Sequence, residues 1–326
     1  MACTSSPSQR FWGRFAAAAL LALGLAGVST QLRAQDIAIG EGVALGWGQF
    51  YVADKEKSWE AQGLKPDVVT FASGRLALDA LVGGRLVIAT AAETPVVFAN
   101  LNGLPVRIIA TLNRHEPFDL VAINKIKTAK DIKGHKIGYA QGTNAHYYLA
   151  KLLAVNDLTF SDITAVNLSP GDFVTSLANG SIDGFIWTEP HLSLALAQGP
   201  DRFHIISSPG LYNTYSSVVT LQLTIDKNPD LLVKALRALI AADKVLKAEP
   251  AASAATVAGR IKLDPQIAAN FWNRAQFDLT LNKPDVVKLL QEEAKWAIDS
   301  KLTRPDAKVP DFNPVVVTEI YEKARQ

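Results

Sequence analysis

The feature that most constrains the fold is an alternation of short apolar segments with helical patterns of about ten residues. In the first third of the chain, strands are predicted at residues 36–41, 67–71, 85–91 and 106–112. Helical patterns lie between them, and one begins near Pro95 and ends at Asn102-Gly103. Strands that alternate with helices predict parallel βαβ units with right-handed crossovers, so we expect an α/β protein.

A second series of the same kind follows residues 113–117. Strands are predicted at residues 119–124, 136–140, 163–168, 184–187, 203–207 and 216–223, with helices at 145–155, 170–178 and 190–198. The remaining chain is mostly helical, with helices predicted at 231–248, 251–261, 265–271, 284–300 and 315–324. No low-complexity linker separates the two series. The boundary between them is therefore predicted to be a crossing of strands.

One internal similarity links the two series. Residues 73–93 and 169–189 align at a fixed offset of 96, with Leu81 and Leu177, Gly84 and Gly180, and Glu93 and Glu189 in step. This similarity is either a chance match or a sign of two similar α/β lobes. Ligands of open parallel sheets bind beyond the carboxyl ends of the strands. Two such lobes facing each other would enclose a small molecule.

Several predicted helices begin with residues suited to binding anions. Gly142 and Thr143 connect a buried strand to the helix at 145–155, and Ser73 precedes an earlier helix. Such starts point unpaired backbone N–H groups and the positive helix end at one spot. The same residues can serve as helix caps. Capping and ligand binding are compatible, so both interpretations stay open.

The N-terminus has the layout of a secretory signal peptide. Arg10 and Arg14 precede the apolar residues 15–28, which are too few for a stable membrane anchor, and cleavage is predicted after Ala34. The only cysteine, Cys3, lies before the apolar run, in a position unsuited to a lipid anchor. Removing residues 1–34 changes the formal charge from +2 to −1. We expect a soluble, periplasmic, cysteine-free protein with no tendency to bind nucleic acid.

The sequence contains no catalytic motif that we can identify. Residues 138–143 lack the Gly-Lys-Ser/Thr ending of a phosphate-binding loop, and no nucleophile elbow or Cys/His pair is present. His115, His135, His191 and His204 lack the spacing of metal ligands. The prediction is a protein that is not an enzyme and has no metal or cofactor. The alternative is an exported enzyme.

Six stretches of the chain, in order, resemble the solute-binding proteins of bacterial importers for aliphatic sulfonates, taurine and nitrate, a group that includes thiamine-precursor binders. They read AQGLKPDVVTFASG, ALVGGRLVIATAAETP, GLPVRIIA, TAKDIKGHKIGYAQGTNAHYYL and LANGSIDGFIWTEPH, together with the signal peptide. The resemblance implies the type II periplasmic-binding-protein fold, an α/β fold in which two lobes, each a mainly parallel sheet flanked by helices, enclose a cleft. Lobe 1 would comprise residues 35–118 and 220–326, and lobe 2 residues 119–219.

The resemblance also implies the partners and the ligand contacts. The partners would be a small-molecule ligand and the permease and ATPase subunits of an importer, and we expect a monomer. A related branch of this fold synthesises the thiamine pyrimidine with a cysteine-rich signature, which this chain lacks. The ligand-binding residues carried over by position are Trp47, Ser73, Gly74, Thr90, Glu93, Thr94, Gly142, Thr143, His146, Trp187 and Glu189.

The chemistry of these residues leaves the ligand open. Trp47 and Trp187 are either flat walls with an indole donor or core residues, and His146 is either a neutral donor or a surface residue. Glu93 stands where sulfonate binders usually have a small residue, and with Glu189 it either caps a helix or accepts a hydrogen bond from the ligand. An organic sulfonate or taurine-like molecule is the first expectation. The alternatives are nitrate, a nitrogen heterocycle or an aromatic acid.

Overall fold

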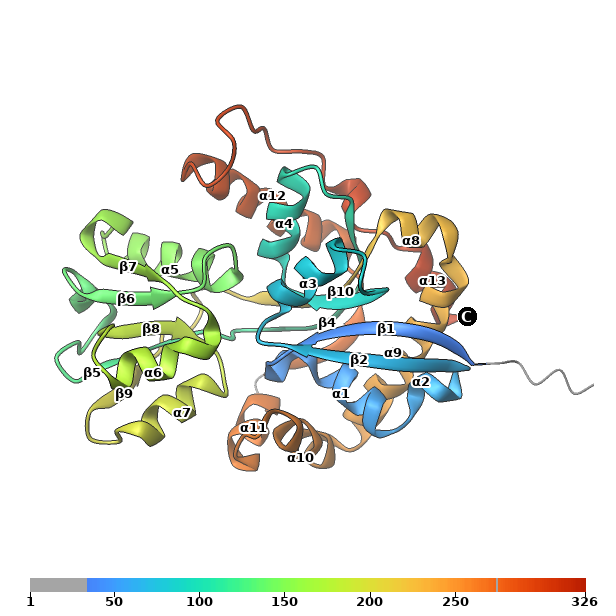
Figure 1. Cartoon of the computed structure of the whole chain (residues 1–326), viewed down its shortest axis with the longest axis horizontal. Coiled ribbons are helices and arrows are strands. Elements are labelled where there is room, and N and C mark those ends of the chain that lie inside the picture. Colours follow the sequence, from blue (N-terminus) through green and yellow to red (C-terminus); the bar gives the residue numbers. More distant parts are fainter. Residues whose placement is uncertain (1–33, 274) are drawn as a thin grey trace, which may run out of the picture. The chain divides into compact units, whose positions relative to one another are not determined.

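The computed structural model describes residues 34–273 and 275–326, so the predicted signal segment lies outside the described residues except for Ala34. The described chain forms two β-sheets (Figure 1). The first has the order β11(Gln276–Thr280), β4(Val106–His115), β10(Thr214–Leu221), β3(Ile88–Ala91), β1(Gln35–Gly42), β2(Leu64–Phe71). The second has the order β7(Thr164–Asn167), β6(Lys136–Tyr139), β8(Gly184–Trp187), β5(Asp119–Ile123), β9(Phe203–Ile206).

The two sheets share one topology. In the first, β2, β1 and β3 run parallel and β10 lies antiparallel beside β3; in the second, β7, β6 and β8 run parallel and β5 lies antiparallel beside β8. The two similar segments of the sequence end in β3 and β8, which hold equivalent places in their sheets. The fold is therefore two lobes of mainly parallel sheet, as the alternation predicted, with one antiparallel crossing strand in each that the pattern did not reveal.

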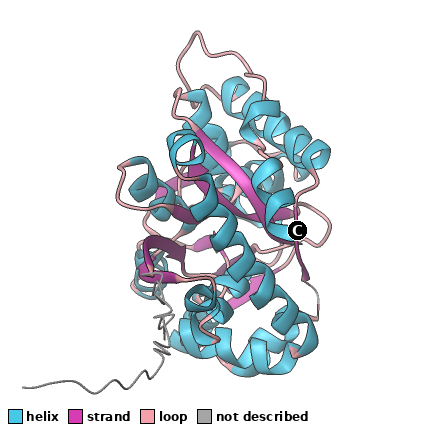
Figure 2. Ribbon diagram, turned by 90° about the vertical axis from the view of Figure 1, so that its right-hand side faces the viewer, coloured by secondary structure: helices cyan, strands magenta, loops and turns pink. Residues whose placement is uncertain are grey.

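Helices cover the sheets of both lobes (Figure 2). Lobe 1 carries α1(Gly48–Lys55), α2(Ser58–Ala61), α3(Gly74–Val82), α4(Glu93–Leu101), α8(Gln222–Lys227), α9(Pro229–Ala248), α10(Pro250–Ile261), α11(Pro265–Trp272), α12(Lys283–Asp299) and α13(Glu319–Arg325). Lobe 2 carries α5(Asn144–Val155), α6(Phe173–Ala178) and α7(His191–Gln198). Short 3-10 turns span Leu45–Trp47, Ala129–Ile132, Phe160–Asp162, Pro170–Asp172 and Asn313–Val315. Proline occupies the first turn of α9, α10, α11 and α12, where its missing N–H is not needed.

The apolar side chains form separate cores. In lobe 1, one core packs the first sheet against α1, α9 and α10, and another packs it against α3, α4 and α12. Lobe 2 has its own core between its sheet and α5, α6 and α7. Trp296 of α12 packs against the cores of both lobes. Helix α12 is therefore a contact between the lobes in addition to the two chain crossings.

The chain leaves lobe 1 after β4 and returns to it in β10. All eight residues of β10, Thr214–Leu221, pair with β3 or β4 of the first sheet. The predicted lobe boundary between residues 219 and 220 falls inside this strand, and the predicted strand at 216–223 ends earlier because α8 begins at Gln222. We propose that lobe 2 is bounded by the crossings at residues 116–118 and 207–213.

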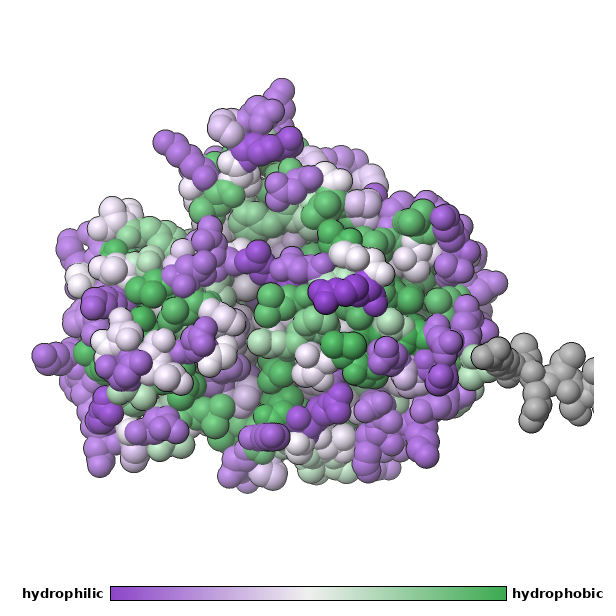
Figure 3. All heavy atoms as spheres, in the orientation of Figure 1, coloured by the Kyte–Doolittle hydropathy of each residue, from purple (hydrophilic) through white to green (hydrophobic). Residues whose placement is uncertain are grey.

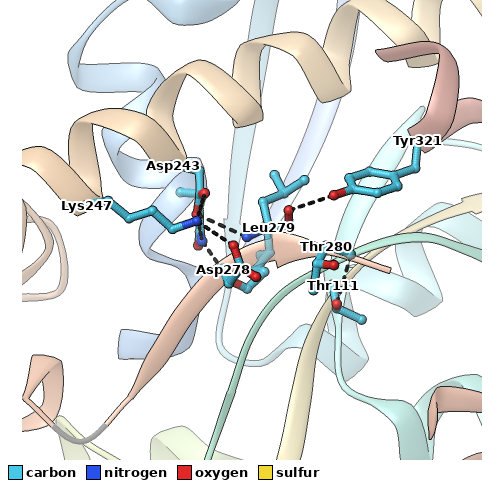
Figure 4. A network of polar contacts seen from close by, with 9 residues as sticks. Thr111, Asp243, Lys247, Asp278, Leu279, Thr280 and Tyr321 are labelled. Atoms are coloured by element: carbon cyan, nitrogen blue, oxygen red, sulfur yellow. Dashed lines mark hydrogen bonds and ion pairs between the residues drawn. The ribbon is translucent and has the colours of Figure 1, made fainter. Parts of the chain in front are cut away.

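Strand β11 was not predicted, and polar contacts from neighbouring helices hold it at the sheet edge (Figure 4). The buried Asp243 of α9 accepts hydrogen bonds from Leu279 N at 3.2 Å and from Gln49 Nε2 at 2.9 Å, and it pairs with Lys247 Nζ at 2.8 Å. Tyr321 Oη donates to the Leu279 carbonyl at 3.0 Å. These tertiary contacts explain why local sequence did not reveal the strand.

Figure 3 shows that hydrophilic side chains cover the segment that follows α12, at the top of the view, while hydrophobic residues gather toward the middle of this face. Within the part of the chain that the structure describes, no helix combines the length and apolar character that crossing a membrane requires.

Candidate ligand-binding site

A pocket of about 50 Å³ lies between the two lobes. Its walls come from the loops after β1, β2 and β3 and from β4 and β10 of lobe 1, and from the start of α5 and the end of β8 in lobe 2. The lining residues are Val43, Ala44, Gly46, Trp47, Ser73, Gly74, Ala92, His115, Pro117, Phe118, Thr143, Asn144, Trp187, Thr188, Thr214 and Ser216. This lining contains no Asp, Glu, Lys or Arg, so the pocket carries no formal charge, and its accessible wall is mostly apolar with a few polar groups.

Two helices from opposite lobes begin at this pocket. In lobe 1, Ser73 caps α3 by accepting a hydrogen bond from Leu76 N at 3.3 Å. In lobe 2, Thr143 precedes α5 and donates its hydroxyl to the Ala140 carbonyl at 2.7 Å. The first turn of a helix has N–H groups without intrahelical partners and a positive dipole end. Both helix starts therefore favour an anionic or strongly accepting group in the pocket.

Two buried indole N–H groups also belong to the pocket wall. Trp47 ends the 3-10 turn after β1, and Trp187 is the last residue of β8; their exposed fractions are 6% and 4%. Neither Nε1 atom has a hydrogen-bond partner in the described residues. A buried unpaired donor costs about 1–3 kcal/mol, and a ligand oxygen would remove that cost. Phe118, whose ring centroid lies 6.1 Å from that of Trp187, adds an apolar surface beside it.

The crossing strands supply a group of pocket residues that sequence reasoning missed: His115 of β4, and Thr214 and Ser216 of β10. Burial lowers the pKa of His115 to about 3, so its ring is neutral in the physiological range, and its Nδ1 has no partner in the described residues. A Cβ atom at Gly46 would lie 2.5 Å from Ser216 Oγ and 2.8 Å from His115 Cε1, so this position requires glycine.

These residues had a sequence signal. Polar side chains recur at alternate positions at the ends of both crossing strands, as Asn113 and His115 in one and Thr214 and Ser216 in the other. Alternate residues of a strand share a face. Asn113 lies on this face and fixes the loop that carries Trp47, because its Nδ2 donates to the Gly46 carbonyl at 2.6 Å.

Of the residues predicted from the resemblance, the structure brings five together in the pocket lining: Trp47, Ser73, Gly74, Thr143 and Trp187. Thr90 lies below the pocket, where its Oγ1 accepts a hydrogen bond from Gly42 N at 2.9 Å. Thr94 points away and donates to Glu293 Oε2 at 2.6 Å. Both threonines are fully buried; Thr90 holds the backbone at Gly42, and Thr94 joins α4 to α12.

Gly142 and His146 lie beside the pocket and are not part of its lining. Gly142 has φ +74°, a backbone conformation that favours glycine, and its N–H faces His146 Nδ1 at 3.3 Å. His146 is 2% exposed and packs against the rings of Tyr139, Phe160 and Trp296. Burial lowers its pKa to about 4, so the ring is neutral at pH 7, and it packs in the interior instead of at the surface.

The two glutamates have partners within the protein. Glu93, the first residue of α4, is 1% exposed and accepts hydrogen bonds from the hydroxyls of Tyr212 and Thr214 and from Tyr215 N. Glu189 accepts from Ser193 N at 3.0 Å and Ser193 Oγ at 2.8 Å at the start of α7. Neither glutamate lines the pocket. Both carboxylates are hydrogen-bonded within the protein, and neither is part of the proposed binding site. Among the described residues, no cluster of His, Cys, Asp and Glu is suited to holding a metal ion.

Comparisons with known proteins agree with this two-lobed arrangement. A family model described as NMT1/THI5 like matches residues 47–253, which is more than half of the chain. The chain belongs to the NMT1/THI5-like family. The match begins at the pocket residue Trp47 and includes both chain crossings, so the family region contains all the lining residues from Trp47 to Ser216.

Among curated relatives of this NMT1/THI5-like protein are two whose names provisionally describe each as an aliphatic sulfonates-binding protein. The one from Escherichia coli (strain K12) is 25% identical over 238 residues, covering 72% of this chain and 74% of the relative. The one from Bacillus subtilis (strain 168) is 27% identical over 280 residues, covering 83% of each. These relatives are named as binding proteins, not as enzymes.

Solved structures show the same fold. The alkanesulfonate-binding protein SsuA from Xanthomonas axonopodis pv. citri, bound to MOPS, superposes with a TM-score of 0.77 at 22% identity, covering 87% of this chain and 98% of its own. The desulfurization enzyme DSZB superposes with a TM-score of 0.64 at 14% identity, covering 89% of this chain and 99% of its own. At such identities the likeness shows the type II periplasmic-binding fold alone, and this fold carries both binding proteins and an enzyme.

Proposed function

We propose that this protein is the solute-binding component of an ATP-driven importer and that it captures a small organic molecule with an oxyanion head. The observation that carries the proposal is the uncharged pocket between the lobes, where two helix N-termini meet two indole side chains whose N–H groups have no partner in the described residues. Sulfonates are ionised at pH 7 and accept several hydrogen bonds from neutral donors. The names of the sulfonate-binding relatives support the same class of ligand.

The pocket also favours some sulfonates over others. Trp47, Trp187 and Phe118 offer aromatic surface to an organic body, which favours an alkanesulfonate over nitrate. The lining contains no carboxylate that could receive an ammonium group, because Glu93 and Glu189 are engaged elsewhere. A taurine molecule bound in this pocket would therefore have no carboxylate to pair with its ammonium group. We propose an alkanesulfonate without an amine, ahead of taurine, a nitrogen heterocycle or an aromatic acid.

Export and delivery complete the proposed function. The signal-like segment and the absence of cysteine after Cys3 support a periplasmic protein, cleaved after Ala34 and not anchored by lipid. The partners would be the permease and ATPase subunits of the importer, with no chemistry on the binding protein itself. The intact mass of the protein recovered from the periplasm should correspond to a chain that begins at Gln35.

A thermal-shift screen of the purified protein tests the ligand class. The panel is butanesulfonate, ethanesulfonate, taurine, nitrate, benzoate and a thiamine precursor. A ligand at 100 times its Kd raises the free energy of unfolding by about 2.7 kcal/mol. We expect the largest increase in melting temperature with the alkanesulfonates and a smaller one with taurine. Shifts only with cationic or uncharged compounds would contradict the oxyanion proposal, and steady turnover of any compound would contradict the binding role.

A further inference from the structure

Two buried carboxyl groups meet behind the pocket. Glu93 of α4 and Glu293 of α12 are 1% and 0% exposed, and the hydroxyl of Tyr212 contacts both, with Tyr212 Oη 3.0 Å from Glu293 Oε1. Tyr212 lies in the returning crossing, and its side chain packs in the core of lobe 2 against Phe118 and Tyr147. The carboxyl groups of lobe 1 are thus joined through a tyrosine to lobe 2.

Counting the donors shows where a proton must be. Glu93 accepts from Thr214 Oγ1 at 2.7 Å and from Tyr215 N at 3.2 Å through Oε2, and from Tyr212 through Oε1. Tyr212 has one hydroxyl hydrogen, so it cannot also donate to Glu293. With Tyr212 donating to Glu93, its contact with Glu293 is a hydrogen bond only if Glu293 is a carboxylic acid and donates. The reverse assignment, with the proton on Glu93, is disfavoured because Glu93 accepts two further hydrogen bonds and Glu293 accepts only one.

The other contacts of Glu293 agree with this assignment. Its Oε2 accepts from Thr94 Oγ1 at 2.6 Å, which leaves Oε1 to carry the hydrogen. No Lys or Arg forms an ion pair with Glu93 or Glu293 in the described residues. Two neighbouring buried carboxylates without a cation would repel each other strongly. Burial raises the pKa of both carboxyl groups, that of Glu93 to about 7 and that of Glu293 well above its ordinary value, and the charge of Glu93 adds to the increase at Glu293.

The hydrogen bonds continue from this pair to the pocket wall. Because Thr214 donates to Glu93, its oxygen is left to accept from Asn144 Nδ2 at 3.0 Å. Thr214 and Asn144 both line the pocket, from lobe 1 and lobe 2 respectively. Two series of hydrogen bonds therefore converge on Glu93, one from Glu293 through Tyr212 and the other from Asn144 through Thr214.

We propose that Glu293 is a positioning residue that is held as a carboxylic acid at neutral pH, and that its proton keeps Tyr212, Glu93 and the Thr214–Asn144 wall of the pocket in place. Loss of this proton at alkaline pH makes both carboxyl groups anionic, breaks the bond to Tyr212 and loosens the contact between the lobes. The inference about ligand binding rests on the proposed function; the inference about the proton does not.

The groups that face this pair do not titrate in the same range. Tyr147 of α5 faces Glu293, and burial raises its pKa to about 12; Tyr215 of β10 faces Glu93, and burial raises its pKa as well. His146, on the same helix as Tyr147, has its pKa lowered to about 4. The charged neighbours are Glu292 and Asp285 of α12, Lys151, which lies over the Tyr147 ring, and Arg114 of β4, which lies over the Tyr215 ring. A change between pH 6 and pH 9 therefore reports on the carboxyl pair.

Two amide substitutions distinguish the carboxyl groups. In Glu293→Gln, the amide can donate to Tyr212 and accept from Thr94, so it reproduces the protonated acid at every pH. In Glu93→Gln, an amide group meets three donors and must direct its own N–H hydrogens at one of them. We expect Glu293→Gln to melt close to the wild type at pH 6 and Glu93→Gln to melt well below it. Equal losses in both variants would contradict the assigned direction of the hydrogen bonds.

The pH profile of the melting temperature tests the proton itself. A group whose pKa is raised in the folded protein stabilises it below the unfolded pKa, and that stabilisation is lost as the pH rises through the folded pKa. The melting temperature of the wild type, minus that of Glu293→Gln, should fall by at least about 3 °C between pH 6 and pH 9. Glu292→Gln removes an exposed charge that contributes least to the raised pKa of Glu293, so it should change the profile of the wild type far less than Glu293→Gln does. Parallel profiles for the wild type and Glu293→Gln would overturn the proposal.

Two further measurements cover the cases in which a variant does not fold or no sulfonate binds. Infrared spectra of the wild type at pH 7 should contain the C=O band of a protonated carboxyl group, and its absence would also overturn the proposal.

In calorimetric titrations with butanesulfonate, the wild type should lose at least threefold in affinity from pH 7 to pH 9, and Glu293→Gln should keep its affinity. Equal losses in the two proteins would contradict the positioning role. If butanesulfonate binds neither protein at any pH, the proposed function fails, and the melting profiles and the infrared band still decide the proton.

Discussion

At the scale of single residues, recognition depends on donors that the folded protein leaves unpaired. Trp47 and Trp187 both line the pocket, and each has a buried indole N–H without a partner in the described residues. The two residues come from different lobes, so a ligand that accepts from both joins the lobes. This arrangement predicts that each indole contributes separately to affinity and that neither contributes through charge.

Replacing either tryptophan by phenylalanine should weaken the binding of an alkanesulfonate. Trp47→Phe and Trp187→Phe each remove one donor to an anionic group, a loss of about 1.5–3 kcal/mol, or roughly tenfold to a hundredfold in Kd. Calorimetric titration with butanesulfonate measures the change. Trp59→Phe is the matched control, because Trp59 is also buried with an unpaired N–H but lies in the lobe 1 core outside the pocket. Unchanged affinity in both pocket variants would show that the indoles are only walls.

Single residues of the pocket were predictable where they follow a local motif. Ser73 and Thr143 begin helices after predicted strands, and such starts are visible in the sequence. The surroundings of Glu93 could not be predicted, because Tyr212 and Glu293 lie 119 and 200 positions away along the chain, and only the fold brings them together. His115 and Thr214 were missed for the same reason, since their pairing across β4 and β10 joins distant segments.

At the scale of elements, β11 shows how tertiary contacts can create a strand. Its five residues, Gln276–Thr280, alternate polar and apolar side chains, but the run is short, and the strand pairs with only part of β4. The carboxylate of Asp243 receives the N–H of Leu279 from β11 and the amide of Gln49 from α1. One side chain of α9 therefore connects a helix and an edge strand (Figure 4).

Removing this carboxylate should destabilise lobe 1. Asp243→Ala leaves buried N–H groups of Leu279 and Gln49 without their acceptor, and we expect a loss of about 2–3 kcal/mol in the free energy of unfolding. Chemical denaturation followed by tryptophan fluorescence measures it. Asp278→Ala is the control, because Asp278 is an exposed partner of the same Lys247, and its loss should change stability by less than about 0.5 kcal/mol. Similar effects in the two variants would contradict the role of Asp243.

Most elements were predictable because their hydrophobic periodicity is local. The strands and helices from β1 to β9 were found within a few residues of their observed ends, including β8 at residues 184–187. The errors lie where the chain changes direction. The predicted strand at 216–223 is replaced at its end by α8, and the antiparallel direction of β5 and β10 depends on how the chain crosses between lobes.

At the scale of the whole described unit, a few polar contacts connect the lobes beside the pocket. Arg75 of α3 donates to the Gln141 carbonyl in the loop after β6, and Asn144 of α5 donates to Thr214. The pocket between the lobes, at about 50 Å³, is small. We therefore expect the walls to separate to admit an alkanesulfonate and to close again around it.

Closure should be measurable, and Arg75 should contribute to it. Small-angle scattering should give a smaller radius of gyration with butanesulfonate than without it. Arg75→Ala removes a solvent-exposed contact worth about 0.5–1 kcal/mol, so the Kd should rise roughly twofold to fivefold. Arg85 is an exposed arginine of lobe 1 without a contact to lobe 2 among the described residues, so Arg85→Ala should leave the Kd unchanged. A radius that does not change with ligand would contradict closure.

The position of α12 has a mechanical consequence. The two chain crossings leave lobe 1 side by side, because His115 at the end of β4 pairs with Thr214 at the start of β10. Adjacent crossings define a pivot about which the lobes can rotate. Trp296 of α12 contacts lobe 2 separately, with its ring centroid 5.0 Å from those of His146 and Tyr147 of α5. If the lobes rotate about the crossings, this indole has to move along α5, so we expect the aromatic contact to guide the rotation.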